Sequence, residues 1–161
     1  MTQDLIDAIA EQERRLVLDR FDEEIAFTIG CAIRERALAM NGPVSIEIRS
    51  AARRYFFTTL SGATPENEDW GRRKINTVLR TYKSSMRAGL FYELEGRAQW
   101  PDVGLPYSDF VLHGGGFPVT VKGVGVVAAI GISGLPSIED HEMATATLAE
   151  HIGVTLTPLP R

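Results

Sequence analysis

Apolar residues recur every three or four positions in four segments of the chain, and this spacing predicts four helices. The segments cover about residues 2–15, 22–40, 64 to 84–87, and 137–152. Capping residues mark three of the starts: Thr2, Asp22, and Thr64 followed by Pro65. The fourth begins at Ser137-Ile138-Glu139-Asp140, which resembles a capping box.

Strand patterns lie between these helices. Apolar and polar residues alternate strictly from Val44 to Arg49, and the run 55–60 is rich in strand formers, so the two predict an antiparallel hairpin whose first strand is half-buried. Runs 117–121 and 124–133 predict a second hairpin, and Leu16-Val17-Leu18 a brief strand. Hairpins rather than βαβ crossovers favour an α+β fold with a mainly antiparallel sheet and helices on its faces.

Residues 90–116 carry the weakest pattern. Leu90 to Leu94 has the composition of a short strand, but the glycines and prolines that follow predict a long surface excursion. Loops of that length in a compact domain tend to be functional or to pack against a partner chain.

Composition narrows the class of protein. The chain has 161 residues, 44% hydrophobic and 24% charged, which suits one globular domain spanning 1–161 with its core at about 5–152. A net charge of −4 argues against a primary nucleic-acid role. Cys31 is the only cysteine, and we find no signal peptide and no membrane-length apolar run. We therefore expect a cytoplasmic protein.

Two glycine motifs resemble known signatures of ligand binding. Gly123 to Ala128 matches G-x-G-x-x-A, but β-branched strand residues follow it where a dinucleotide site needs a helix, so we interpret it as a hairpin. His113-Gly114-Gly115-Gly116 resembles an esterase oxyanion loop, yet the chain lacks a G-x-S-x-G nucleophile elbow. The three glycines are equally compatible with an anion-binding nest and with a tight turn into the strand at Phe117.

Histidines and a basic helix supply the candidate ligand-binding side chains. The spacing of the three histidines does not favour a zinc site, and His113, beside the glycines, is the one best placed to meet a ligand or iron. On the third helix, Trp70 and Lys74 with Arg73 are candidates to border a pocket for a flat, anionic ligand. The alternatives are a solvated or capping histidine and a solvated helix face.

Several of these segments together resemble the heme-degrading domain family, which includes GlcG-like and HbpS-like proteins. The matching stretches are 113–118, 123–126, 131–134 and 140–142, and Asp69-Trp70 with Arg72, Arg73, Lys74 and Asn76 is similar to one branch of small proteins within that family. The resemblance covers about residues 5–152. It implies a profilin-like α/β/α sandwich around a five-stranded antiparallel sheet, assembled as a homo-oligomer of dimers or larger rings.

The resemblance also implies binding of heme or a related tetrapyrrole, with oxidative heme breakdown in some members. We therefore expect a site for heme, a related tetrapyrrole or another small anionic ligand, with His113 as the ligand of a heme iron. Its expected residues are Trp70, Arg73, Lys74, His113, Gly114, Gly115, Gly116 and Phe117. The alternative, from another functional class, is a non-enzymatic oligomeric scaffold that docks a partner protein. In that case Trp100 and Tyr107, in the long 90–112 segment, are the expected anchors.

Overall fold

The computed structural model describes all 161 residues and contains five helices and five strands. The helices are α1 (Thr2–Arg15), α2 (Glu23–Ala39), α3 (Pro65–Thr81), α4 (Ser85–Leu94) and α5 (Ser137–Ile152). The strands are β1 (Val17–Leu18), β2 (Ser45–Arg49), β3 (Arg54–Thr59), β4 (Gly116–Val121) and β5 (Gly125–Ser133). None of the helices combines the length and the apolar character that crossing a bilayer requires.

The strands form one sheet in the order β1-β4-β5-β2-β3. Both predicted hairpins, β2–β3 and β4–β5, are confirmed, and β5 pairs antiparallel with β2 to join them. β1 pairs parallel with β4, so the sheet is mixed rather than wholly antiparallel. β1 and β4 are not joined by a hairpin, since two strands and three helices separate them along the chain.

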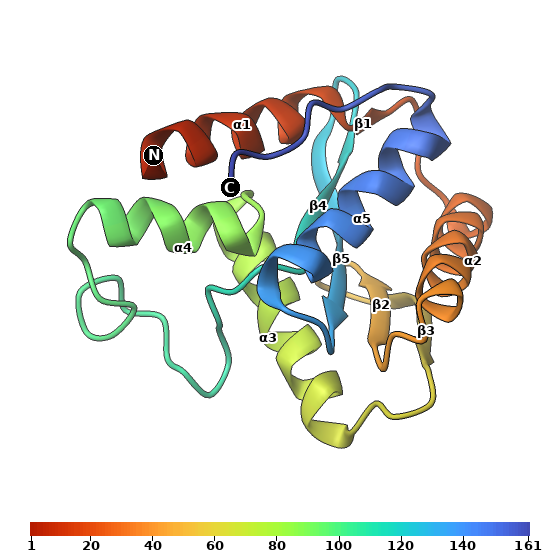
Figure 1. Cartoon of the computed structure of the whole chain (residues 1–161), viewed down its shortest axis with the longest axis horizontal. Coiled ribbons are helices and arrows are strands. Elements are labelled where there is room, and N and C mark those ends of the chain that lie inside the picture. Colours follow the sequence, from red (N-terminus) through yellow and green to blue (C-terminus); the bar gives the residue numbers. More distant parts are fainter.

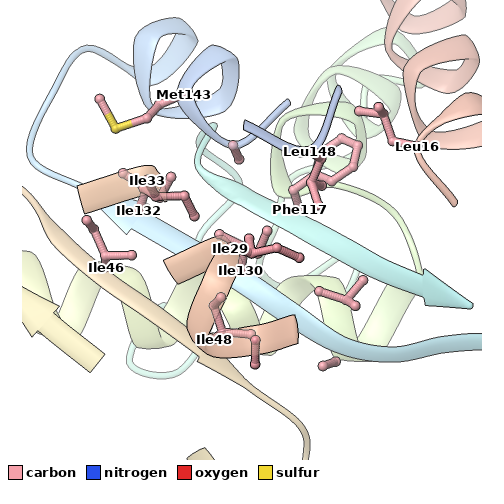
Figure 2. Close-up of a cluster of buried hydrophobic side chains, with 14 of the residues drawn as sticks. Leu16, Ile29, Ile33, Ile46, Ile48, Phe117, Ile130, Ile132, Met143 and Leu148 are labelled. Carbon is pink, nitrogen blue, oxygen red and sulfur yellow. The ribbon is translucent and has the colours of Figure 1, made fainter. Parts of the chain in front are cut away.

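Helices cover both faces of this sheet, which confirms the predicted α+β sandwich (Figure 1). α2 and α5 pack on one face, where isoleucines from α2, β2 and β5 meet Phe117 and Leu148 in the main hydrophobic core (Figure 2). α3 packs on the other face over β5, through Ile75 and Val78. α1 lies beside α4, away from the centre of the sheet.

The strand β2 departs from the half-buried pattern expected of it. Ser45 and Glu47, on the face expected to meet solvent, are 2% and 6% exposed because α3 covers them. Glu47 accepts hydrogen bonds from Arg49 at 3.1 Å and Arg54 at 2.7 Å, which compensate for the burial of its charge.

Helix α3 ends earlier than predicted, and the helix that follows it was missed. Tyr82 adopts a left-handed conformation (φ 56°) that terminates α3. The Ser84 hydroxyl then accepts from the Arg87 N–H at 3.2 Å and caps α4, so residues 90–94 are helical and not a strand. The surface excursion is therefore shorter than expected, covering 95–115, and it loops away beside α4 before returning to β4 (Figure 1).

The predicted helix starts are partly confirmed. Asp22 caps α2, and Thr64 with Asn67 forms a capping box at α3 with Pro65 in the first turn. Thr2 and Ser137 are each the first residue of their helix and do not cap it, since the N-cap positions are Met1 and Pro136. The Ser137 hydroxyl accepts from the Gly114 N–H instead. The G-x-G-x-x-A motif lies in the β4–β5 hairpin, as the strand interpretation predicted.

Replacing Asp22 with Ala is expected to lower the free energy of unfolding by about 1 kcal/mol, since its carboxylate accepts from the Ile25 N–H at 2.9 Å. Urea unfolding of the variant measures the loss. Asp22→Asn, which keeps an acceptor at the same place, is the matched control and should stay close to the wild-type protein. An equal loss in both variants would contradict a capping role.

Candidate functional site

A polar recess of about 350 Å³ lies between the first half of α3, the end of β5 and the start of α5. It is lined by residues from these elements and by His113 from the 95–115 segment: Glu66, Asn67, Trp70, Lys74, His113, Ser133, Gly134, Leu135, Ser137 and Asp140. We call it the inner recess. Only Trp70 and Leu135 contribute apolar walls, so polar groups dominate its surface.

A buried ion pair forms the floor of the inner recess. The Lys74 ammonium contacts Asp140 Oδ2 at 3.0 Å and donates to the Ile132 carbonyl at 2.9 Å, while Asp140 Oδ1 accepts from the Leu135 N–H at 3.2 Å. Both side chains are almost completely buried. Burial lowers the pKa of Lys74 and raises that of Asp140 to about 6, because each charged form loses its hydration.

Lys74 was expected to face an anionic ligand, and it does line the recess. Its charge is instead committed to Asp140 and the Ile132 carbonyl. The ion pair therefore acts first on the structure, joining α3, β5 and α5 beneath the recess. Sequence reasoning missed this role of Asp140, because an acidic residue in the first turn of a helix is adequately explained by the helix dipole.

The three glycines form a tightly packed turn behind the recess. The Gly114 N–H donates to the Ser137 hydroxyl at 2.6 Å, and the Gly116 N–H donates to the Ser85 hydroxyl at 2.9 Å. Gly115 has a φ of +125°, and a Cβ there would come within 2.2 Å of the Ile132 carbonyl oxygen. Two of the three N–H groups are thus already paired within the protein, which favours the tight-turn interpretation over an anion-binding nest.

His113 lies at the rim of the recess against Trp70. The two rings meet edge to face, with centroids 5.3 Å apart and planes at 82°. Arg73 stacks on Trp70, with its guanidinium carbon 4.7 Å from the indole centroid, and pairs with Asp69 at 3.0 Å. Partial burial and the charges of Lys74 and Arg73 lower the pKa of His113, so the imidazole is neutral at physiological pH.

The structure therefore brings together Trp70, Lys74 and His113 as lining residues, with Arg73 stacked behind the indole. It places the predicted glycines behind this surface. Phe117 is fully buried in the main core, with its ring against His141, and does not reach the recess. Ser137 joins the site through its bond to Gly114, a pairing 23 residues apart that no local pattern indicates.

The metal chemistry open to this site is limited by its donors. No three His, Cys, Asp or Glu side chains gather closely enough to hold a metal ion. His113 is thus a single donor, and one imidazole suits a metal that brings its other ligands with it, as the iron of heme does. A neutral, exposed imidazole beside a flat indole fits such a group.

Comparison with known proteins places the chain in a family. Residues 21–149 match the family described as "Haem degrading protein HbpS-like". The chain belongs to the HbpS-like family. A UPF0303 protein of Mesorhizobium japonicum is 47% identical to it over 151 residues, covering 94% of this chain and 90% of that protein. This confirms the family expected from the 113–142 motifs.

Solved structures share the fold of this HbpS-like protein. The crystal structure of Ybr137w protein superposes with a TM-score of 0.85 at 27% identity, covering 92% of this chain and 87% of that one. A complex of PduOC with heme superposes with a TM-score of 0.64 at 21% identity, covering 83% and 94% of the two chains. The second likeness concerns the fold alone, and in that structure the heme belongs to PduOC.

Proposed function

We propose that this HbpS-like protein is a cytoplasmic homo-oligomer that binds heme or a related tetrapyrrole at the inner recess, with His113 as the iron ligand. The observation that carries the proposal is the neutral, exposed His113 imidazole fixed edge-on to Trp70 at the rim of the recess. Family membership supports heme as the ligand class, and the heme complex of a protein with the same fold is consistent with it.

Each residue at the rim has a distinct task in this proposal. His113 donates a nitrogen lone pair to iron, which its neutral form allows. Trp70 provides an aromatic wall, and the Arg73 guanidinium stacked behind it supports the indole. Bound heme supplies the redox chemistry, while the protein contributes binding, orientation and electrostatics. The proposal is one of binding and assigns no catalytic residue.

A hemin titration tests the role of His113. The wild-type protein is expected to show a saturable Soret shift at micromolar hemin, and His113→Ala is expected to weaken binding by at least about tenfold through loss of the iron ligand. Iron-free protoporphyrin IX should bind both proteins nearly equally, because it has no iron to coordinate.

His151→Ala is the matched control, since His151 is exposed near the end of α5 and lies outside the recess. It should titrate like the wild-type protein. A wild-type protein that gives no Soret shift would overturn the proposal, and an unchanged His113→Ala titration would remove His113 as the ligand. Light scattering tests the homo-oligomer, which a concentration-independent monomer would contradict.

One observation favours the scaffold alternative. Trp100 and Tyr107 are 54% and 60% exposed on the 95–115 segment, where large aromatic side chains have no partner within the chain to bury them. Such residues are enriched at protein-binding hot spots. If hemin does not bind, the alternative in which a protein partner docks on this segment becomes the better hypothesis.

A further inference from the structure

We propose that the ligand extends across His113 into a second recess on α4, so that the imidazole lies between two lobes of one groove. This inference rests on the proposed function and adds a part of the site that the sequence did not indicate. The second, outer recess has a volume of about 470 Å³ and is lined by Met86, Gly89, Leu90, Tyr92, Glu93, Arg97, Leu112, His113 and Ser137. His113 and Ser137 line both recesses.

The boundary between the two lobes is rigidly held. The Ser85 hydroxyl donates to the His113 carbonyl, and the Ser137 hydroxyl accepts from the N–H of Gly114. On the other side, a Cβ on Gly89 would come within 2.3 Å of the Leu112 carbonyl oxygen, so the backbone of α4 packs directly against the residue before His113. These contacts hold the backbone of His113 in place between α4 and α5, and a metal ligand requires such a fixed position.

The chemistry of the two lobes is complementary. The inner recess is polar, whereas Met86, Leu90, Tyr92 and Leu112 give the outer recess an apolar wall. Ligand sites are mostly apolar and occupy roughly 300–1,000 Å³. At about 350 Å³ the inner recess lies at the small end of that range, and only two of its ten lining residues are apolar. A planar ligand that extends past His113 into the outer recess contacts the apolar side chains that the inner recess lacks.

Two charged residues line the outer lobe, Glu93 and Arg97, and Arg97 is the only one of them that can pair with a carboxylate of the ligand. The Arg97 guanidinium is 5.4 Å from the Tyr92 ring centroid, and its partner Glu95, at 3.2 Å, is 40% exposed, against 46% for Arg97. Exposed pairs of this kind are weak and readily exchanged, so Arg97 is free to meet a carboxylate. Lys74, by contrast, is committed to Asp140. The geometry points to a tetrapyrrole whose carboxylate-bearing edge faces Arg97.

Leu90→Glu tests the apolar lobe by placing a charge on its wall. Binding of both hemin and iron-free protoporphyrin IX is expected to weaken by at least about tenfold, in line with the loss of one apolar side-chain contact. Leu94→Glu is the matched control: it makes the same change one turn further along α4, at a side chain that is 51% exposed and lines neither recess. Binding is followed by the Soret band for hemin and by fluorescence for the iron-free ring.

Arg97→Gln provides a second test that does not disturb the packing of α4. It is expected to weaken hemin severalfold and to leave hemin dimethyl ester, which has no free carboxylates, unaffected. If Leu90→Glu and Arg97→Gln both bind like the wild-type protein while His113→Ala does not, the outer lobe is excluded and the proposed function stands. If the wild-type protein binds no hemin, the proposed function itself fails.

Discussion

Asp140→Asn is expected to lower the free energy of unfolding by about 3–5 kcal/mol at pH 7.5, the largest effect we foresee for a single substitution of a polar side chain. The variant leaves the Lys74 ammonium buried with the Ile132 carbonyl and without a countercharge. Removing one member of a buried pair is costly because the remaining charge is neither hydrated nor neutralised. Urea unfolding at constant pH measures the change.

Two further variants separate this effect from a general sensitivity of α5. Glu142, on the same helix as Asp140, pairs at 3.0 Å with Arg161 at the end of the chain. Glu142→Gln breaks this solvent-accessible pair and should cost less than about 1 kcal/mol. The double variant Lys74→Met with Asp140→Leu replaces both charges with apolar groups and should recover most of the loss. A small loss in Asp140→Asn, comparable with that of Glu142→Gln, would show that the pair is not isolated from water.

The parts of the fold that could be predicted are those that depend on near neighbours in sequence. The Asp22 cap needs only residues 22–25, and the β4–β5 hairpin needs only its own turn and alternation. The break between α3 and α4 was missed because the apolar stripe of α3 continues in register to Met86. Nothing in that stripe shows that Tyr82 adopts a left-handed conformation.

The candidate site was harder to predict because its decisive contacts join distant segments. Lys74 and Asp140 are 66 residues apart, and each has an adequate local explanation as a residue on a charged helix. The glycines after His113 allowed either a nest or a turn, and the choice depends on what packs against them. In the fold, Ser85 and Ser137 accept hydrogen bonds from the N–H groups of Gly116 and Gly114, and the neighbouring His113 lies at the rim of the recess.

Acidification is expected to destabilise the protein through His141, by up to about 3 kcal/mol between pH 6.5 and pH 4. Burial lowers the pKa of His141 from 6.5 to about 4. Its Nε2 lies 2.8 Å from the Gln12 Oε1 and donates to it, whereas Nδ1 is buried without a partner, so the folded protein offers no acceptor for a second proton. The unfolded chain takes up that proton near pH 6.5, and stability is lost as the pH falls toward 4.

Asp140 titrates in the same pH range, which determines the design of the experiment. Burial raises its pKa from 3.8 to about 6, and protonation of its carboxylate removes the countercharge of Lys74, so the two groups titrate as a pair. The pH profile of the wild-type protein alone therefore mixes the contribution of His141 with that of the Lys74–Asp140 pair. The contribution of His141 is isolated by subtracting the unfolding free energy of His141→Gln, which retains a donor toward Gln12 but does not titrate.

We expect the difference in unfolding free energy between the wild-type protein and His141→Gln to be constant above pH 7. As the pH falls from 6.5 to 4, the unfolding free energy of the wild-type protein should decrease relative to that of the variant. His151→Gln is the control, because His151 is exposed on the same helix. A difference for His141→Gln that does not change with pH would mean that His141 accepts its proton as easily in the folded protein as in the unfolded chain. The packing of Phe117 and Gln12 around it would then have to open below pH 6.5, since His141 is fully buried between them.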